Sequence, residues 1–222
     1  MSHTLLFLAL PAALTDWYAV ARRQKRLEYL AKPAIMLLLT AWFVQNGGGQ
    51  GWRAWFVLGA LFSLAGDVFL MLRRERFLAG LTSFLMAHLA YILGFNPSLP
   101  PLHLLTLLLG LGLAVSGYFF VRILWRALQK RGLPRLKIPV LIYALVLGLM
   151  CLSALATHTR PEWQGSPAWV ASLGGLLFTL SDSLLATNKF VRRLPAGRFF
   201  THLTYHLGQA GILLGVLLAA RF

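Results

Sequence analysis

Eight long apolar stretches occupy most of this 222-residue sequence. They run over residues 4–20, 31–45, 52–72, 77–95, 102–125, 138–156, 167–188 and 200–220. A helix needs about 20 predominantly apolar residues to cross the hydrocarbon core of a bilayer, and most of these stretches are close to that length. The sequence therefore predicts an all-α membrane protein with eight transmembrane helices, of which the second stretch is the shortest.

The composition excludes a soluble globular protein. Hydrophobic residues make up 58% of the chain and charged residues 12%, whereas soluble domains contain about 25% charged residues. The connections between the apolar stretches are short, so almost nothing remains for a soluble domain. We expect one integral membrane domain over residues 1–222.

The formal charge of +15 is concentrated in alternate connections. Lys and Arg cluster in residues 22–32, 73–76, 126–137 and 189–198, whereas the other connections hold few. By the positive-inside rule the basic connections are cytoplasmic and both termini are outside. Basic loops contact anionic headgroups, so we expect membrane lipids as partners, no nucleic acid and no obligate protein partner. The short Arg- and Leu-rich chain is typical of the bacterial inner membrane.

Two aspartates lie inside apolar stretches, although the chain has only six acidic residues. Asp67 ends residues 61–67 and Asp182 ends residues 177–182, and both segments begin Leu-Phe. A charged side chain at the centre of a membrane helix costs about 2.5–3.5 kcal/mol or more, and by default it indicates a functional site. The alternative is a structural carboxylate paired with Lys or Arg from the adjacent basic loop. The matched positions favour a catalytic role for Asp67 and Asp182.

Further landmarks recur in the same order in the two halves. Lys32 and Pro33 open the second stretch, and Lys137 and Pro139 open the sixth. After the aspartates, residues 84–91 and 200–205 each place a His and a Tyr behind a Phe. Units of four helices would have the same orientation across the membrane. We expect two parallel four-helix repeats, over residues 1–100 and 101–222, although apolar stretches also align by chance.

Other polar side chains are expected near the depth of the aspartates, in the cytoplasmic half of the bundle. The candidates for substrate binding are Lys32, His88, Tyr91, Tyr143, Ser181, Ser183, His202, Tyr205 and Gln209. Buried Tyr and Gln need hydrogen-bond partners, although a Ser in a helix often bonds only the carbonyl one turn earlier. A lone buried His is often a packing residue. Lys32 and Lys137 are at the depth of a lipid phosphate, or else extend to the interface.

His202 and His206 lie one helical turn apart, the spacing of two metal ligands on a helix. No Glu follows His202 in the required place, and no third ligand is evident nearby. We predict neither a metal nor a cofactor. Asp16, near the inner end of the first stretch, is expected to form a charge pair with Arg22 and Arg23 at the interface.

Taken together, these residues resemble the YhhN family. The resemblance rests on blocks in a fixed order: Lys32-Pro33, Gly66-Asp67, His88 with Tyr91, Tyr143 with Met150, Ser181-Asp182-Ser183, and Tyr205 with Gln209. It covers nearly the whole chain, with one departure at His206, where an aromatic residue is expected. The resemblance implies an eight-helix membrane fold and a lysophospholipid substrate. For characterised members it implies hydrolysis of the vinyl ether bond of lysoplasmalogen to a fatty aldehyde and glycerophosphoethanolamine or glycerophosphocholine.

Two buried carboxyl groups suit this chemistry. A vinyl ether hydrolyses by protonation at carbon, and water captures the oxocarbenium ion that forms. The acid has to be protonated near neutral pH, and both burial and a neighbouring carboxylate favour the protonated form. We hypothesise that one of Asp67 and Asp182 is the acid and the other positions the water, much as paired carboxylates act in glycosidases. The sequence does not decide which is which.

Two other functions stay open. Paired intramembrane carboxylates and parallel repeats also build proton-coupled transporters of small molecules or lipids. Such transporters usually contain broken helices, and neither aspartate stretch has an internal proline. The third possibility is a scaffold that binds lipid without turnover.

Overall fold

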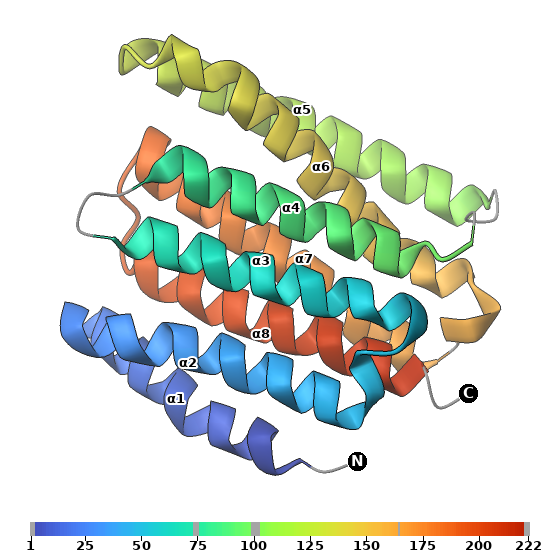
Figure 1. Ribbon diagram of the computed structural model, residues 1–222. Coiled ribbons are helices and arrows are strands. Elements are labelled where there is room, and N and C mark those ends of the chain that lie inside the picture. Colours follow the sequence, from blue (N-terminus) through green and yellow to red (C-terminus); the bar gives the residue numbers. More distant parts are fainter. Residues whose placement is uncertain (1–2, 73–75, 99–102, 164, 220–222) are drawn as a thin grey trace.

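The computed structural model describes residues 3–72, 76–98, 103–163 and 165–219, and in these ranges the chain is almost wholly helical (Figure 1). Eight helices of the described chain are long and apolar enough to cross a membrane, which confirms the predicted fold class. Their bounds are α1 Thr4–Ala21, α2 Lys25–Phe43, α3 Ala54–Met71, α4 Phe77–Phe95, α5 Leu104–Lys130, α6 Lys137–Leu155, α7 Ser166–Ala186 and α8 Gly197–Ala219. Short helical turns connect them: η1 Val44–Gly48, η2 Gly51–Arg53, η3 Pro134–Leu136, η4 Ala156–Thr159, η5 Pro161–Trp163 and η6 Thr187–Val191.

Two helices extend further than the apolar stretches predict. Helix α2 begins at Lys25 rather than residue 31, and α5 continues to Lys130 rather than residue 125. Lys and Arg are good helix formers, so the backbone stays helical beyond the apolar segment and into the polar interface. As a result Lys32 and Pro33 lie inside α2 and do not open it.

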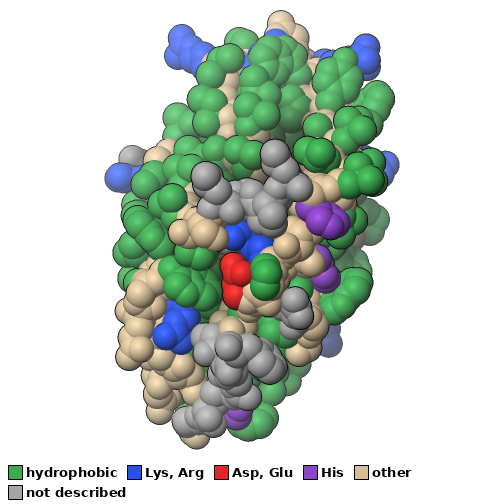
Figure 2. Space-filling view, turned by 90° about the vertical axis from the view of Figure 1, so that its right-hand side faces the viewer, with side chains coloured by type: hydrophobic (Ala, Val, Ile, Leu, Met, Phe, Trp, Pro, Cys, Tyr) green, Lys and Arg blue, Asp and Glu red, His purple; other side chains and the backbone are tan. Residues whose placement is uncertain are grey.

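The helices run alternately in opposite directions. In Figure 1, α1 begins and α8 ends on the right, and the connections α1–α2, α5–α6 and η6–α8 lie on the left. The described basic connections therefore share one end of the bundle, as the charge pattern predicts, while Arg73 and Arg74 lie outside the described residues. Which end faces the cytoplasm stays a prediction. Seen from the right-hand end, hydrophobic side chains cover the flanks and charged side chains are scattered (Figure 2).

Helix α8 lies at the centre of the bundle and packs closely on α7. Small residues permit this approach: a Cβ atom added to Gly174 would lie 2.4 Å from the backbone nitrogen of Ile212, and one added to Gly208 would lie 2.8 Å from that of Phe178. Lipid tails are as apolar as the helix surfaces, so the hydrophobic effect does not drive helices together within a membrane. Helices there associate through close packing at small residues such as these. The glycines thus set the spacing of two helices that carry predicted site residues.

Helix α5 is attached differently. Only Leu124 and Leu128 of α5 are buried, both toward its basic end, and the helix packs mainly on α6 and η6. In Figure 1, α5 and α6 form the upper edge of the molecule, next to α4 and α7. The rest of α5 exposes Leu107, Leu111 and Phe119, as expected for a helix that faces lipid.

Candidate active site

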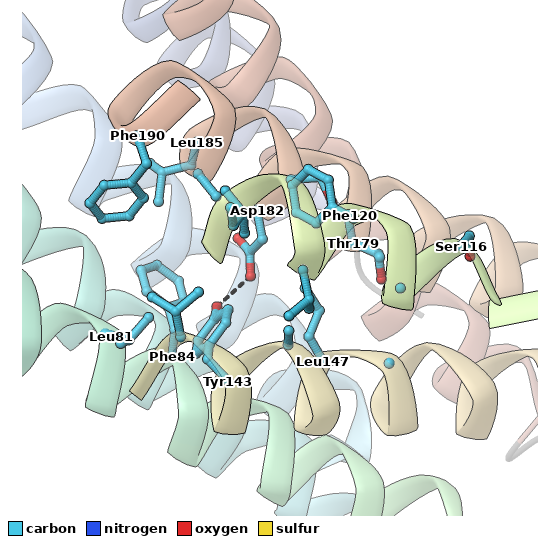
Figure 3. A pocket seen from close by; sticks show the side chains of 18 of the residues that line it. Leu81, Phe84, Ser116, Phe120, Tyr143, Leu147, Thr179, Asp182, Leu185 and Phe190 are labelled. Atoms are coloured by element: carbon cyan, nitrogen blue, oxygen red, sulfur yellow. Dashed lines mark hydrogen bonds between the residues drawn. The ribbon is translucent and has the colours of Figure 1, made fainter. Parts of the chain in front are cut away.

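A cavity of about 380 Å³ lies between the α5–α6 pair and helices α4 and α7 (Figure 3). This volume is within the usual range for small-molecule sites, about 300–1,000 Å³. Its walls are almost entirely apolar, and the labelled residues include Leu81, Phe84, Phe120, Leu147, Leu185 and Phe190. The polar side chains that reach it are Ser116, Tyr143, Thr179, Asp182 and Ser183. The cavity therefore suits a hydrocarbon chain with a reactive group at one place on its wall.

Asp182 is the acidic group in this cavity. The Tyr143 hydroxyl donates a hydrogen bond to Asp182 Oδ2, and Figure 3 shows the two side chains pointing toward one another. His88 Nε2 lies 3.0 Å from the Tyr143 hydroxyl and 3.1 Å from Asp182 Oδ2. Helices α4, α6 and α7 each supply one member of this cluster, so their packing fixes its geometry.

The two oxygens of Asp182 differ in their surroundings. Oδ2 has both Tyr143 and His88 as partners, whereas no hydrogen bond to Oδ1 is found among the described residues. Ser183 Oγ donates to the carbonyl of Thr179 at 2.8 Å, one turn earlier in its own helix. Ser183 therefore bonds the carbonyl one turn earlier in α7, as a Ser in a helix often does, and does not bond Asp182. Oδ1 is the oxygen left to meet a ligand.

Asp67 is enclosed by its own partners. Lys32 Nζ lies 2.8 Å from Asp67 Oδ1, and the Tyr205 hydroxyl donates to Asp67 Oδ2 at 2.7 Å. Asp67 is fully buried, and only 10% of the Lys32 side chain is exposed. The Lys32 ammonium also lies 5.2 Å from the centre of the Tyr205 ring, a cation–π contact. None of the three lines the apolar cavity.

Aromatic rings lie between the two aspartate clusters. The Phe178 ring centre is 5.4 Å from that of Tyr205 and 4.8 Å from that of His88. No hydrogen bond joins Asp67 to Asp182 among the described residues. Each aspartate has one partner from the preceding helix and one from the other half of the chain, on α2 and α8 for Asp67 and on α6 and α4 for Asp182. The two-fold repeat itself stays a prediction.

Three further residues predicted to bind substrate lie between helices. The Tyr91 hydroxyl donates to Gln209 Oε1 at 2.6 Å, and Gln209 Nε2 donates to Ser63 Oγ at 2.9 Å. Ser181 Oγ donates to the carbonyl of Thr201 at 3.0 Å. These bonds join α3, α4, α7 and α8, and none of the residues lines the apolar cavity. Their contact with a substrate stays a prediction.

The environment of Asp16 corrects the sequence analysis. Asp16 is fully buried, and its Oδ2 lies 2.7 Å from His202 Nδ1, whereas Arg22 is exposed over the ring of Tyr18. Because α1 remains helical to Ala21, Asp16 faces α8 and does not meet the arginines that follow it. The signal for burial that the sequence offered is that Asp16 still lies within the apolar stretch of residues 4–20.

Two more features lie at this end of the bundle. One is the ion pair between Glu28 and Arg198, and the other is Lys137, which was considered as a ligand of the lipid phosphate. Arg198 pairs with Glu28 at 2.5 Å, close to His202. The residues Glu28 and Arg198 were not singled out by the sequence, because they lie at helix ends where charge is ordinary. The Lys137 ammonium donates a hydrogen bond to Gln129 Oε1 at 2.5 Å and lies 4.9 Å from the centre of the Trp125 ring, and its role at the membrane interface stays a prediction.

The family match and the similar proteins agree with one another. Residues 27–216 match the model of the YhhN family. Lysoplasmalogenase TMEM86B of Mus musculus is 33% identical over 189 residues, which cover 84% of this chain and 73% of that protein. The Sus scrofa protein of the same name is 35% identical over 187 residues, covering 83% and 72%, and the Homo sapiens protein is 33% identical over 188 residues, also covering 83% and 72%. No solved structure gives a significant match.

Proposed function

This chain belongs to the YhhN family, and from that premise we propose that it is a lysoplasmalogenase-like hydrolase that cleaves the vinyl ether bond of a lysophospholipid within the membrane. The observation that carries the proposal is the carboxyl of Asp182 on the wall of a mostly apolar cavity. The names of the similar proteins support the same activity.

Of the two aspartates, Asp182 is the acid in our proposal. It lines the apolar cavity, whereas Asp67 is closed off by Lys32 and Tyr205. Because Oδ2 of Asp182 accepts the hydrogen bond of Tyr143, the carboxyl proton belongs on Oδ1. An alkenyl chain in the cavity then presents its double bond to that proton.

The reaction needs one acid and one water molecule. Asp182 Oδ1 gives its proton to the vinyl carbon farther from the ether oxygen, and the carbon bound to oxygen becomes part of an oxocarbenium ion. Water adds to that carbon and gives a proton back to the Asp182 carboxylate, which forms a hemiacetal. The C–O bond to glycerol then breaks: the hemiacetal hydroxyl loses its proton to become the aldehyde, and the glycerol oxygen takes up a proton. One water is consumed, and positioned acid–base groups of this kind contribute about 10²–10⁴-fold to rate.

In this proposal Asp67 does not contact the substrate and acts through other residues. Its ion pair with Lys32 and its bond to Tyr205 hold α2, α3 and α8 together beside the aromatic rings that contact His88. Asp67 is therefore a positioning residue in our proposal, which differs from the sequence-based hypothesis that the second aspartate positions the water. The enzyme names of the relatives favour this account over the transporter alternative.

The proposal is tested by product analysis with purified protein in detergent. Incubated with 1-alkenyl-glycerophosphoethanolamine, it is expected to release fatty aldehyde and glycerophosphoethanolamine in equal amounts. The matched 1-alkyl ether, which lacks the double bond, is expected to stay intact. Release of a fatty acid from the 1-acyl lysolipid, with no aldehyde from the alkenyl lipid, would assign an esterase and overturn the proposal.

A further inference from the structure

A second cavity, of about 1060 Å³, lies at the end of the bundle that holds the α1–α2 and η6–α8 connections. Its lining is rich in cations and contains no Asp or Glu among the described residues. The basic residues that line it are Arg23, Lys25, Lys189, Arg193 and Arg198, with His202 beside them. We call this space the basic cavity. Like charges gathered around one hollow favour an anion between them.

Three of these cations have no carboxylate partner within the described chain. Arg198 is paired with Glu28, and the ammonium of Lys189 lies 4.9 Å from the centre of the Phe77 ring. The described residues include no ion-pair partner for Arg23, Lys25 or Arg193. The chain as a whole has 21 Lys and Arg against six acidic residues, so it carries an excess of cations, and an anionic ligand would supply the counterion that the described residues do not.

The basic cavity adjoins the apolar cavity. Leu70 and Leu185 line both. At the junction, η6 places Phe190 in the wall of the apolar cavity and its neighbour Lys189 in the wall of the basic cavity. Together the two cavities have the polarity of a single-chain lipid, with hydrocarbon walls on one side and cations on the other.

The spacing along α7 fits such a lipid. Leu185 follows Asp182 by three residues on α7, which corresponds to roughly 5 Å at a rise of 1.5 Å per residue, and Lys189 lies four residues farther along the chain, in η6. In a lysoplasmalogen only the glycerol backbone separates the vinyl ether from the phosphate. A vinyl ether held at Asp182 therefore brings the phosphate to the boundary of the basic cavity.

We propose that the basic cavity binds the phosphate of the lysophospholipid substrate, with Lys25 and Arg193 as its main cationic ligands. This inference rests on the proposed function. The recognised group is the phosphate and not the headgroup amine, because the described lining holds no carboxylate to pair with an ammonium. Charge-assisted hydrogen bonds to phosphate are the stronger kind, and Arg binds it through two parallel N–H groups.

The test measures binding of non-hydrolysable ether lipids to the full chain in detergent. The probes are 1-alkyl-glycerophosphoethanolamine, 1-alkyl-glycerol-3-phosphate and 1-alkylglycerol, which has no phosphate. The test variant is Lys25→Gln/Arg193→Gln. Its control is Lys130→Gln/Arg131→Gln, which removes the same two charges from exposed residues outside both cavities at the same end of the bundle. Arg23 is left unchanged because its backbone has φ +56°.

We expect the test variant to bind both phosphate lipids about tenfold or more weakly, and to bind 1-alkylglycerol as the unaltered chain does. The control variant is expected to bind all three probes normally, and 1-alkyl-glycerol-3-phosphate at least as tightly as the ethanolamine lipid. If the test and control variants lose the same affinity for the phosphate lipids, the binding reflects general attraction by a basic surface, and the proposal is overturned. Binding of inorganic phosphate that depends on Lys25 and Arg193, with unchanged lipid binding, would assign the cavity to free phosphate and also overturn it.

Failure of this inference is distinguishable from failure of the proposed function. Aldehyde release with an unchanged KM in Lys25→Gln/Arg193→Gln would retain the hydrolase and reject the phosphate site. Lipid binding that depends on the two cations, without any aldehyde from the alkenyl lipid, would retain the phosphate site and reject the hydrolase. Circular dichroism and size-exclusion profiles of both variants check the fold, and the 1-alkylglycerol probe checks that the apolar cavity is intact.

Discussion

Asp182 and Asp67 occupy matched places in the sequence, and the difference between them is access to a cavity. Asp182 has one oxygen with no hydrogen bond among the described residues, beside apolar walls, whereas both oxygens of Asp67 have partners. The cost of a carboxylate in a membrane helix identified both residues from sequence. It could not separate them, because the pairing of Asp67 with Lys32 depends on how α2 packs against α3.

The hydroxyl of Tyr143 is expected to matter for turnover more than for binding. Tyr143→Phe removes the hydrogen bond that holds Asp182 Oδ2 and keeps the ring that lines the cavity. We expect kcat to fall roughly tenfold, the worth of one hydrogen bond to a charged group, with KM nearly unchanged. Steady-state aldehyde release measures both. Tyr118→Phe on exposed α5 is the control, and a rise in KM alone would show that Tyr143 only binds substrate.

Lys32 and Asp67 are expected to be coupled energetically. Lys32→Met leaves Asp67 as a buried carboxylate without its cation, and loss of one partner of a buried pair costs about 3–5 kcal/mol. Asp67→Asn leaves Lys32 as a buried ammonium without its carboxylate partner. The double variant Lys32→Met/Asp67→Asn is expected to unfold at a lower denaturant concentration than the unaltered chain, but to lose clearly less than the sum of the single changes. Additive losses in denaturant unfolding would contradict the ion pair.

At the scale of elements, the contact between α7 and α8 holds the site together. A Cβ atom at Gly174 would lie 2.4 Å from backbone of α8, whereas one at Gly112 on α5 has nothing within 4 Å. We expect Gly174→Ala to destabilise the protein by about 1–3 kcal/mol through overpacking. Gly112→Ala is expected to be neutral or to stabilise by up to about 1 kcal/mol, since Ala favours a helix. Thermal unfolding in detergent compares them, and equal effects would contradict the close contact.

Helix α5 offers a test of chain binding. A Cβ atom added to Gly117 would meet no atom within 4 Å, and Gly117 lines the apolar cavity, whereas Gly112 on the same helix does not line it. Gly117→Leu is expected to displace about two methylenes of a long alkenyl chain, at about 0.8 kcal/mol each, and so to raise KM roughly tenfold. Short-chain substrates and Gly112→Leu are expected to be unaffected. Chain-length profiles of KM provide the measurement, and identical profiles for the two leucine variants would place the chain elsewhere.

For the whole molecule, the sequence predicts the architecture well and the site in part. The number of helices and their alternation follow from local hydropathy and charge, which do not depend on tertiary contacts. Helix packing does depend on them, so neither the meeting of His88 and Tyr143 at Asp182 nor the hydrogen bond between Asp16 and His202 could be predicted from the sequence. It also could not locate the cavities, because both depend on helix packing: the apolar cavity lies between the α5–α6 pair and helices α4 and α7, and the basic cavity lies at the α1–α2 and η6–α8 connections.

The central claim is that Asp182 protonates the carbon of a vinyl ether in the apolar cavity. Hydrolysis of 1-alkenyl-glycerophosphoethanolamine in D₂O, followed by mass spectrometry of the aldehyde, tests it most directly. We predict that the unaltered chain yields aldehyde with one deuterium on the carbon next to the carbonyl, beyond the exchange seen when aldehyde alone is kept in D₂O. Asp182→Asn is predicted to lower this yield by about 10²-fold or more while still binding the 1-alkyl analogue. Deuterated aldehyde formed by Asp182→Asn at the unaltered rate, or no aldehyde from the unaltered chain, would contradict the claim.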